Sequence, residues 1–290
     1  MPEKSSSFER VVGVPDKQRG AEILDDFKDN FEGKRLREIK EHEIPKTPED
    51  IEVINLANEA TNEIRRKYGF SNFDIPPENI VIVDEPHWGW GEGGDNAYFS
   101  STGQIIATPY SGQNFNFARL MFHEMLHFKS FGSLRVSKDG KTMTEDRSGL
   151  QARMHKGKMY FKNLNEAVTE TLTKNFITGL FRNKDQRFTK EVQELEQRGI
   201  APENLGEGMI FGYGQQREAL NALVDKIFEK NGDIFDSKEE VFGIFVKSIF
   251  NNNLLALGKL IDKTFGVGTF RKLGRLDSDQ DKLTKFVSSL

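Results

Sequence analysis

The segment of residues 114–131 constrains this chain more than any other, because it is apolar on most sides and yet carries two histidines. Asn114 suits an N-cap and Gly132 suits a C-terminal stop, so the segment is predicted to form a helix. Large apolar side chains all around it predict that the helix is buried. Uncompensated polar groups inside such a helix cost about 1–3 kcal/mol each. The histidines therefore need partners that the fold must supply.

The two histidines belong to the pattern His123-Glu124-Met125-Leu126-His127. In a helix they lie about 40° apart around the axis and one turn apart along it, so they can present two imidazoles to one ion. A catalytic zinc takes three protein ligands and keeps a fourth position for water, whose pKa it lowers. We therefore predict one Zn²⁺ per chain on His123 and His127, with Glu124 as general base, although other divalent ions also suit such ligands. Two histidines at the helix surface are the simpler alternative.

The third zinc ligand distinguishes the subclasses of zinc proteins that share the His-Glu-x-x-His pattern. A metzincin would need glycine at position 130 and histidine at position 133, and the chain has Ser130 and Ser133 there, so that subclass is excluded. Downstream, Glu166 and Glu170 lie four residues apart on one face of a predicted helix.

Two alternatives for this acidic pair stay open. Asn163 and Glu166 have the spacing of a capping box, which needs no metal. In addition, Glu166 follows His127 by 39 positions, which leaves room for another ligand, such as Glu145 or Asp146.

Taken together, the His-Glu-x-x-His pattern and Asn165-Glu166-Ala167-Val168-Thr169-Glu170 resemble the gluzincins, which are thermolysin-like and aminopeptidase-like zinc metallopeptidases. The resemblance spans residues 79–181. It implies that Glu166 is the third zinc ligand and that Glu170 orients the imidazole of His123 through the ring nitrogen that does not bind zinc. Asn165 is implied as a further supporting residue. A carboxylate on the distal nitrogen of a ligating imidazole fixes its tautomer and raises its basicity.

Two more elements of a peptidase site follow from the resemblance. Asn96-Ala97-Tyr98-Phe99 is similar to the edge strand on which thermolysin-like enzymes bind the substrate backbone, with Asn96 and Ala97 as contacts. An ordinary amphipathic strand is the alternative. For the oxyanion donor, Tyr213 is the first candidate, because it opens a later helix as in many similar proteins, and His155 is the second.

Composition narrows the functional classes. The net charge of the 290 residues is −4 without a sustained Lys/Arg block, which argues against a nucleic-acid platform. The chain has no cysteine, so disulfides, thiolate metal sites and cysteine nucleophiles are excluded. No 18-residue apolar run and no signal-like N-terminus occur, so we expect a cytoplasmic protein that does not enter membranes, although a trimmed signal would leave the same sequence.

The organisation follows from charge and periodicity. Residues 1–46 are predicted to be a charged tail or linker with a short helix near residues 21–31, residues 47–182 a zincin-like catalytic core, and residues 183–290 a helical C-terminal subdomain. Residues 89–94 match the letters of a nucleotide-binding loop, but a strand rather than a helix follows, so that interpretation is rejected. Strands are predicted at 79–83, 97–99 and 104–107, and a hairpin within 145–163 with strands at 149–154 and 159–161. Helices are predicted at 47–68, 114–131, 164–181, 188–198, 213–230, 238–250, 252–264 and 279–288.

The sequence thus predicts an α+β, zincin-like fold with a small mixed or antiparallel sheet and an active-site helix. The predicted function is hydrolysis of peptide or protein substrates by a zinc metallopeptidase. The rivals are a catalytically silent peptide-binding module, a latent enzyme whose tail covers the cleft, and a hydrolase of non-peptide amides.

Overall fold

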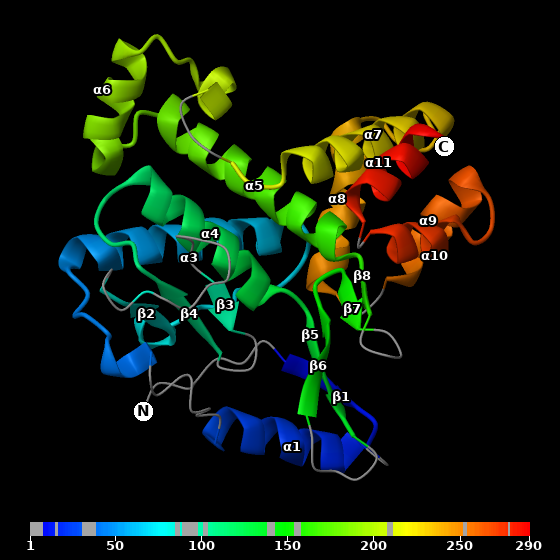
Figure 1. The fold of residues 1–290 in the computed structure, drawn as a ribbon, viewed down its shortest axis with the longest axis horizontal. Coiled ribbons are helices and arrows are strands. Elements are labelled where there is room, and N and C mark those ends of the chain that lie inside the picture. Colours follow the sequence, from blue (N-terminus) through cyan, green and yellow to red (C-terminus); the bar gives the residue numbers. More distant parts are fainter. Residues whose placement is uncertain are drawn as a thin grey trace. The chain divides into compact units, whose positions relative to one another are not determined.

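The computed structural model describes residues 8–14, 17–30, 39–84, 88, 98–100, 104–137, 143–153, 158–207, 211–251, 254–277 and 279–290. The protein is mixed α+β, with small sheets and a helical C-terminal part (Figure 1). Its contacts divide it into two units. The first comprises Met1–Ser7, Pro15–Lys129 and Leu172–Phe211, and the second comprises Phe8–Val14, Ser130–Thr171 and Gly212–Leu290.

The first unit contains a three-stranded sheet in the order β2-β4-β3. Strand β2 (Ile80–Ile82) runs parallel to β4 (Ile105–Thr108), and β3 (Tyr98–Ser100) runs antiparallel to β4. Every residue of β2 and β4 is buried, which explains why both read as continuous apolar runs rather than as alternating patterns. The strands predicted at 79–83 and 104–107 are confirmed.

Helix α3 (Pro48–Lys67) begins as the sequence predicts. The hydroxyl of Thr47 accepts a hydrogen bond from the amide of Asp50 at 3.2 Å, and the carboxylate of Asp50 accepts one from the amide of Thr47 at 2.7 Å. This reciprocal pair is a capping box. The chain leaves the helix through Gly69, whose φ of +87° favours glycine. Local sequence signals therefore define both ends of this helix.

Helix α4 (Phe115–Lys129) carries the histidine pattern and packs against α3 (Figure 1). The Asn114 side chain accepts a hydrogen bond from the Phe117 amide at 2.7 Å, which confirms the predicted N-cap. The predicted C-terminal end is wrong, because the helix stops at Lys129 and Gly132 already belongs to a strand. The Lys129 ammonium donates to the carbonyl of Asn58 at 2.8 Å, so the end of the helix is held against α3.

The first unit also contains α1, the second half of α5 and α6. The Phe122 ring on α4 stacks on Phe176 of α5 with centroids 4.3 Å apart, which anchors the second half of α5 in this unit. The bounds are α1 (Lys17–Asn30), α5 (Lys162–Arg182) and α6 (Thr189–Gln197), with short 3-10 turns at Pro77–Asn79, Gln186–Phe188 and Pro202–Glu207.

The second unit contains a five-stranded sheet in the order β1-β5-β6-β7-β8. Strand β1 pairs parallel to β5, and the other neighbours are antiparallel. The structure differs here from the sequence analysis, which placed Phe8–Val12 in a charged tail, whereas these residues form β1. The β7–β8 pair confirms the predicted hairpin, while β5 and most of β6 were not predicted. The strand bounds are β1 (Phe8–Val12), β5 (Gly132–Val136), β6 (Met143–Ser148), β7 (Gln151–Arg153) and β8 (Met159–Tyr160).

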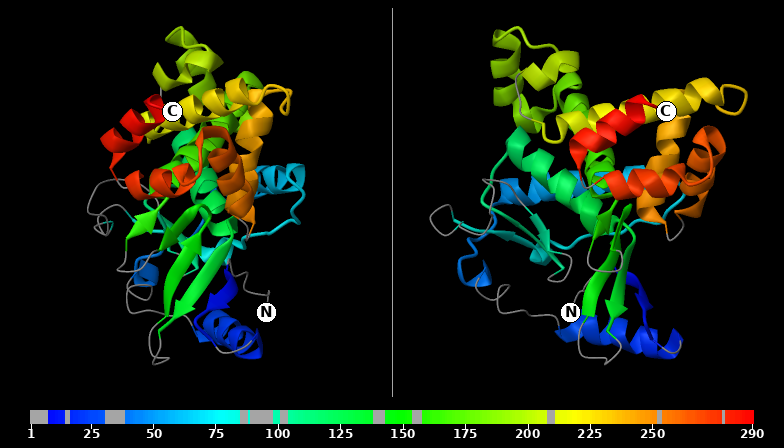
Figure 2. Two further views of the ribbon diagram at one scale, coloured as in Figure 1. Left: turned by 90° about the vertical axis from the view of Figure 1, so that its right-hand side faces the viewer. Right: turned by 45° about the vertical axis from the view of Figure 1, so that its right-hand side comes forward.

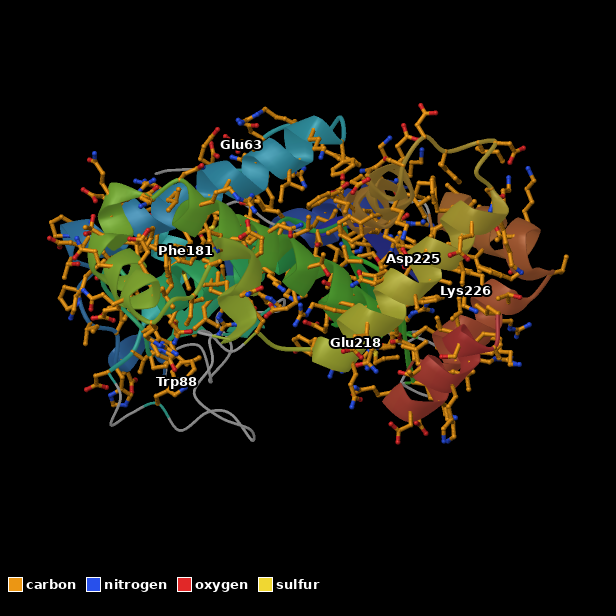
Figure 3. All side chains as sticks on the ribbon, turned by 90° about the horizontal axis from the view of Figure 1, so that it is seen from above. Glu63, Trp88, Phe181, Glu218, Asp225 and Lys226 are labelled. Carbon is orange, nitrogen blue, oxygen red and sulfur yellow. The ribbon has the colours of Figure 1, made fainter. Side chains whose placement is uncertain are left out.

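Five helices complete the second unit, and α7 packs against both α8 and α11 (Figure 2). Asp225 on α7 forms an ion pair with Lys238 at the start of α8 at 2.8 Å, and it lies along α7 with Glu218 (Figure 3). The helices are α7 (Gly214–Lys230), α8 (Lys238–Phe250), α9 (Leu255–Phe265), α10 (Thr269–Leu276) and α11 (Gln280–Ser288). Helix α10 was not predicted. In the part of the chain that the structure describes, no helix is long and apolar enough to cross a membrane.

Candidate metal centre

Helix α4 brings the two histidines together as their spacing predicts. The Nε2 atoms of His123 and His127 lie 3.1 Å apart, and their rings meet edge to face. His123 is 7% exposed and His127 is half-buried. Two ring nitrogens this close either share a proton or direct their lone pairs at one cation, so the pair is suited to hold a metal ion.

Glu166, in the first turns of α5, completes the set. His123, His127 and Glu166 each offer one ligand atom, and these three atoms lie within 4.8 Å of one another. Two ligand atoms at about 2.1 Å from a tetrahedral zinc are roughly 3.4 Å apart, so this cluster needs only small side-chain adjustments to share an ion. Among the described residues, this is the one group of three or more His, Cys, Asp or Glu side chains with that proximity.

The beginning of α5 settles the capping-box alternative for Glu166. The helix starts at Lys162, so Asn163 lies inside the first turn rather than at the N-cap. The carboxylate of Asp277 accepts hydrogen bonds from the amides of Asn163 at 2.6 Å and Leu164 at 3.0 Å. Asp277 therefore caps this helix from the end of α10, and the capping-box interpretation of Asn163 and Glu166 is wrong.

The carboxyl of Asp277 is fully buried, and burial raises its pKa from 3.8 to about 6. The two amide hydrogen bonds oppose this increase, and the charge of Glu166 adds to it. The folded protein thus keeps this proton at pH values where the unfolded chain has lost it. We expect the contribution of Asp277 to the free energy of unfolding of the metal-free protein to fall by roughly 3 kcal/mol as the pH rises from about 4 to about 6, and to stay level above.

The measurement is denaturant unfolding between pH 4 and pH 7, with Asp277→Asn as the reference. The asparagine variant keeps the size of the side chain but cannot titrate, so the difference between the two proteins isolates this one group. If the free energy of unfolding changed with pH in the same way in both proteins, the raised pKa of Asp277 would be contradicted.

Asn165 supports the helix next to Glu166. Its side-chain oxygen accepts a hydrogen bond from the amide of Leu150 at 2.9 Å, so the turn between β6 and β7 is tied to α5. Gly149 in that turn has a φ of +57°, and a Cβ there would collide with the Asn165 oxygen. This contact with backbone fixes the residue next to Glu166, and the supporting role of Asn165 at the metal stays a prediction.

The side chain of Glu170 is hydrogen-bonded to the residue that precedes Tyr213. The Glu170 carboxylate is buried, and its Oε1 accepts a hydrogen bond from the amide of Gly212 at 2.8 Å. Tyr213 follows directly, is 40% exposed, and occupies the N-cap position of α7 with φ 56° and ψ 37°. The bracing of His123 by Glu170 and the oxyanion role of Tyr213 stay predictions.

The other candidates lie elsewhere. Asp146 forms an ion pair with Arg135 at 2.5 Å, and neither Asp146 nor Glu145 belongs to the ligand cluster. Asn96, Ala97, His155 and the glycine-rich segment 89–94 lie outside the described residues, while β3 begins at the next position, Tyr98, as an outer strand of its sheet. Glu124 is 8% exposed on α4 beside His123.

No protein-family model matches this chain, and neither the curated proteins nor the solved structures include a match. The functional argument therefore depends on the chemistry of the site itself.

Proposed function

We propose that this protein is a zinc-dependent metallopeptidase. The observation that carries the proposal is the convergence of ligand atoms from His123, His127 and Glu166 within 4.8 Å, with the carboxylate of Glu124 on the same helix as the two histidines. Two imidazoles and one carboxylate are a typical ligand set of catalytic zinc sites in hydrolases, which keep one position open for water. Pure metal storage would need no base at position 124.

A zinc ion bound here would supply a Lewis acid that polarises the substrate carbonyl and acidifies a water molecule. Glu124 would accept the proton of that water as it attacks the carbonyl, and would then return the proton to the leaving amine. The Tyr213 hydroxyl would donate a hydrogen bond to the oxyanion that develops on the substrate. Glu170 would hold the imidazole of His123 in one tautomer. The strand that begins with Asn96 and Ala97 would pair with the substrate backbone.

The first test is metal analysis together with turnover of unfolded proteins and peptide mixtures. We expect about one zinc per chain in the wild type and hydrolysis that a chelator abolishes and zinc restores. Glu166→Ala removes one of three ligands, so it should leave the site largely empty after dialysis. Glu170→Gln should weaken zinc binding by about 10–100-fold, as expected for a residue that only orients a ligand.

The matched control is Glu218→Ala, which removes an exposed carboxylate on α7 (Figure 3) and should keep the zinc content of the wild type. Undiminished zinc in Glu166→Ala would refute the ligand assignment. A zinc-loaded wild type that binds peptides without cutting them would favour the silent binding module, and cleavage of non-peptide amides alone would favour the narrower hydrolase.

A further inference from the structure

Tyr213 has a backbone conformation that a bulky side chain rarely adopts. Its φ of 56° and ψ of 37° place it in the left-handed region, immediately before the first residue of α7. Such a conformation costs about 1–3 kcal/mol and persists only where the surroundings enforce it. Glycine adopts this conformation without strain, and glycines stand directly before and after Tyr213. The left-handed conformation nevertheless falls on the tyrosine.

Arg217 holds both peptide groups that flank the Cα atom of Tyr213. Its side-chain Nε donates a hydrogen bond to the carbonyl of Gly212 at 3.2 Å, which fixes the peptide plane before Tyr213. Its backbone amide donates to the carbonyl of Tyr213 at 2.9 Å, which fixes the plane after it. The orientations of these two planes define φ and ψ of Tyr213, and thereby the direction of its Cα–Cβ bond.

Glu170 holds the same segment from the opposite side of Gly212. Its Oε1 accepts the Gly212 amide at 2.8 Å, and its carboxylate is 1% exposed. Glu170 lies one helical turn after Glu166 on α5, so the segment before α7 is attached to the helix that carries a metal ligand (Figure 1).

We propose that Arg217 is a positioning residue that, together with the Glu170–Gly212 hydrogen bond, keeps Tyr213 in its left-handed conformation and aims the phenol at the reacting carbonyl. This inference rests on the proposed peptidase function. Preorganised donors contribute most when they do not have to reorganise during the reaction, which is a physical reason to maintain a strained backbone at this residue.

The test is a double-mutant cycle between Arg217→Met and Tyr213→Phe. Loss of the phenol hydroxyl should lower kcat by about 10²–10³-fold, as for other oxyanion donors. Arg217→Met should lower kcat by roughly 10-fold or more in the wild type, with KM and zinc content unchanged, because a small misplacement of a catalytic group is costly. In the Tyr213→Phe background the same change should lower kcat less than about twofold, because no hydroxyl remains to be positioned.

Two further variants separate positioning from general damage. Arg217→Lys keeps a donor that can reach the Gly212 carbonyl and should recover part of kcat. Arg271→Met removes an exposed arginine of α10 and should leave kcat unchanged. Equal losses of kcat from Arg217→Met in the tyrosine and phenylalanine backgrounds would overturn the proposal, since a purely structural role predicts that result.

Hydrogen exchange supplies a readout that does not depend on catalysis. Arg217→Met should accelerate exchange of the amides in residues 211–214 by about 10-fold, and Glu170→Gln should do so most strongly at Gly212. Unchanged exchange would overturn the positioning role even if the wild type is an active peptidase. Faster exchange in a protein that hydrolyses no peptide would refute the proposed function while supporting the control of Tyr213 by Arg217.

Discussion

Replacing Glu124 with glutamine is expected to lower kcat by about 10²–10⁴-fold while zinc stays bound. Glutamine has the shape of glutamate but cannot accept a proton, so the variant removes the general base and little else. Glu124 is 8% exposed on α4 and does not belong to the ligand cluster, which is why zinc content should not fall. Metal analysis and steady-state kinetics on the same preparation measure both quantities.

The pH dependence of kcat/KM adds a second readout for Glu124. Its acidic limb should report the ionisation of the base in the free enzyme, and should disappear from any residual activity of the glutamine variant. Glu63→Gln is the control, because Glu63 is an exposed carboxylate on α3 (Figure 3) and its loss should leave both the rate and the profile unchanged. Full turnover by Glu124→Gln would refute the proposed mechanism.

The parts of the fold that the sequence predicts are those defined within one or two helical turns. The start of the helix at 47–68 and the N-cap Asn114 involve partners three residues apart, so their geometry follows from the local pattern, although the reciprocal hydrogen bond of Asp50 was not predicted. The same is true of His123 and His127, because helix geometry alone places their nitrogens together. Spacing is sufficient wherever the partners belong to one element.

Partners far apart in the chain leave no such signal. The cap of α5 is Asp277, more than a hundred residues from Leu164, and nothing in the spacing of Asn163 and Glu166 points to it. A local motif, the apparent capping box, competed with the metal interpretation, and only the distant carboxylate of Asp277 shows that the capping box is not formed. The predicted end of α4 is wrong for a related reason, because the amide of Phe131, which would continue the helix, donates instead to the distant carbonyl of Ile249 at 2.9 Å.

The N-terminal region illustrates the limit for strands. Phe8–Val12 contains two charged residues and pairs with β5, which lies more than a hundred residues away, so its local composition resembles that of a tail. A single short strand has little periodicity, and pairing with a distant partner overrides its composition. The consequence for the latency hypothesis is practical: a deletion that tests the role of the N-terminus must end before Phe8, or it will remove a strand of the sheet.

Arg147 is expected to contribute more to the stability of the second unit than any exposed ion pair. Its guanidinium donates hydrogen bonds to the carbonyls of Gly149 at 2.7 Å, Ser248 at 2.9 Å and Asn251 at 2.9 Å. It also lies 4.8 Å from the centroid of the Phe131 ring. Burial lowers the pKa of Arg147 to about 10, so it remains charged at neutral pH. One side chain thus joins β6, the following turn and the end of α8.

Arg147→Met should lower the free energy of unfolding by about 3–5 kcal/mol, because it leaves three carbonyls without their charged donor and removes the stacking on Phe131. Arg147→Lys should recover only part of this loss, since one ammonium cannot reproduce the planar fork. The control is Arg135→Met, which breaks the largely exposed pair with Asp146 and should cost less than about 1 kcal/mol. Denaturant unfolding followed by circular dichroism measures all three.

Arg147→Met should also affect the metal site. Arg147 holds the carbonyl of Gly149, and the next amide, that of Leu150, is bound by Asn165 beside Glu166. Loosening this turn should therefore weaken zinc binding in Arg147→Met but not in Arg135→Met, even at temperatures where both variants are folded. Equal stability of the two variants would show that the buried guanidinium does not join these segments. A destabilised Arg147→Met with unaltered zinc affinity would show instead that Glu166 is positioned by the Asp277 cap alone.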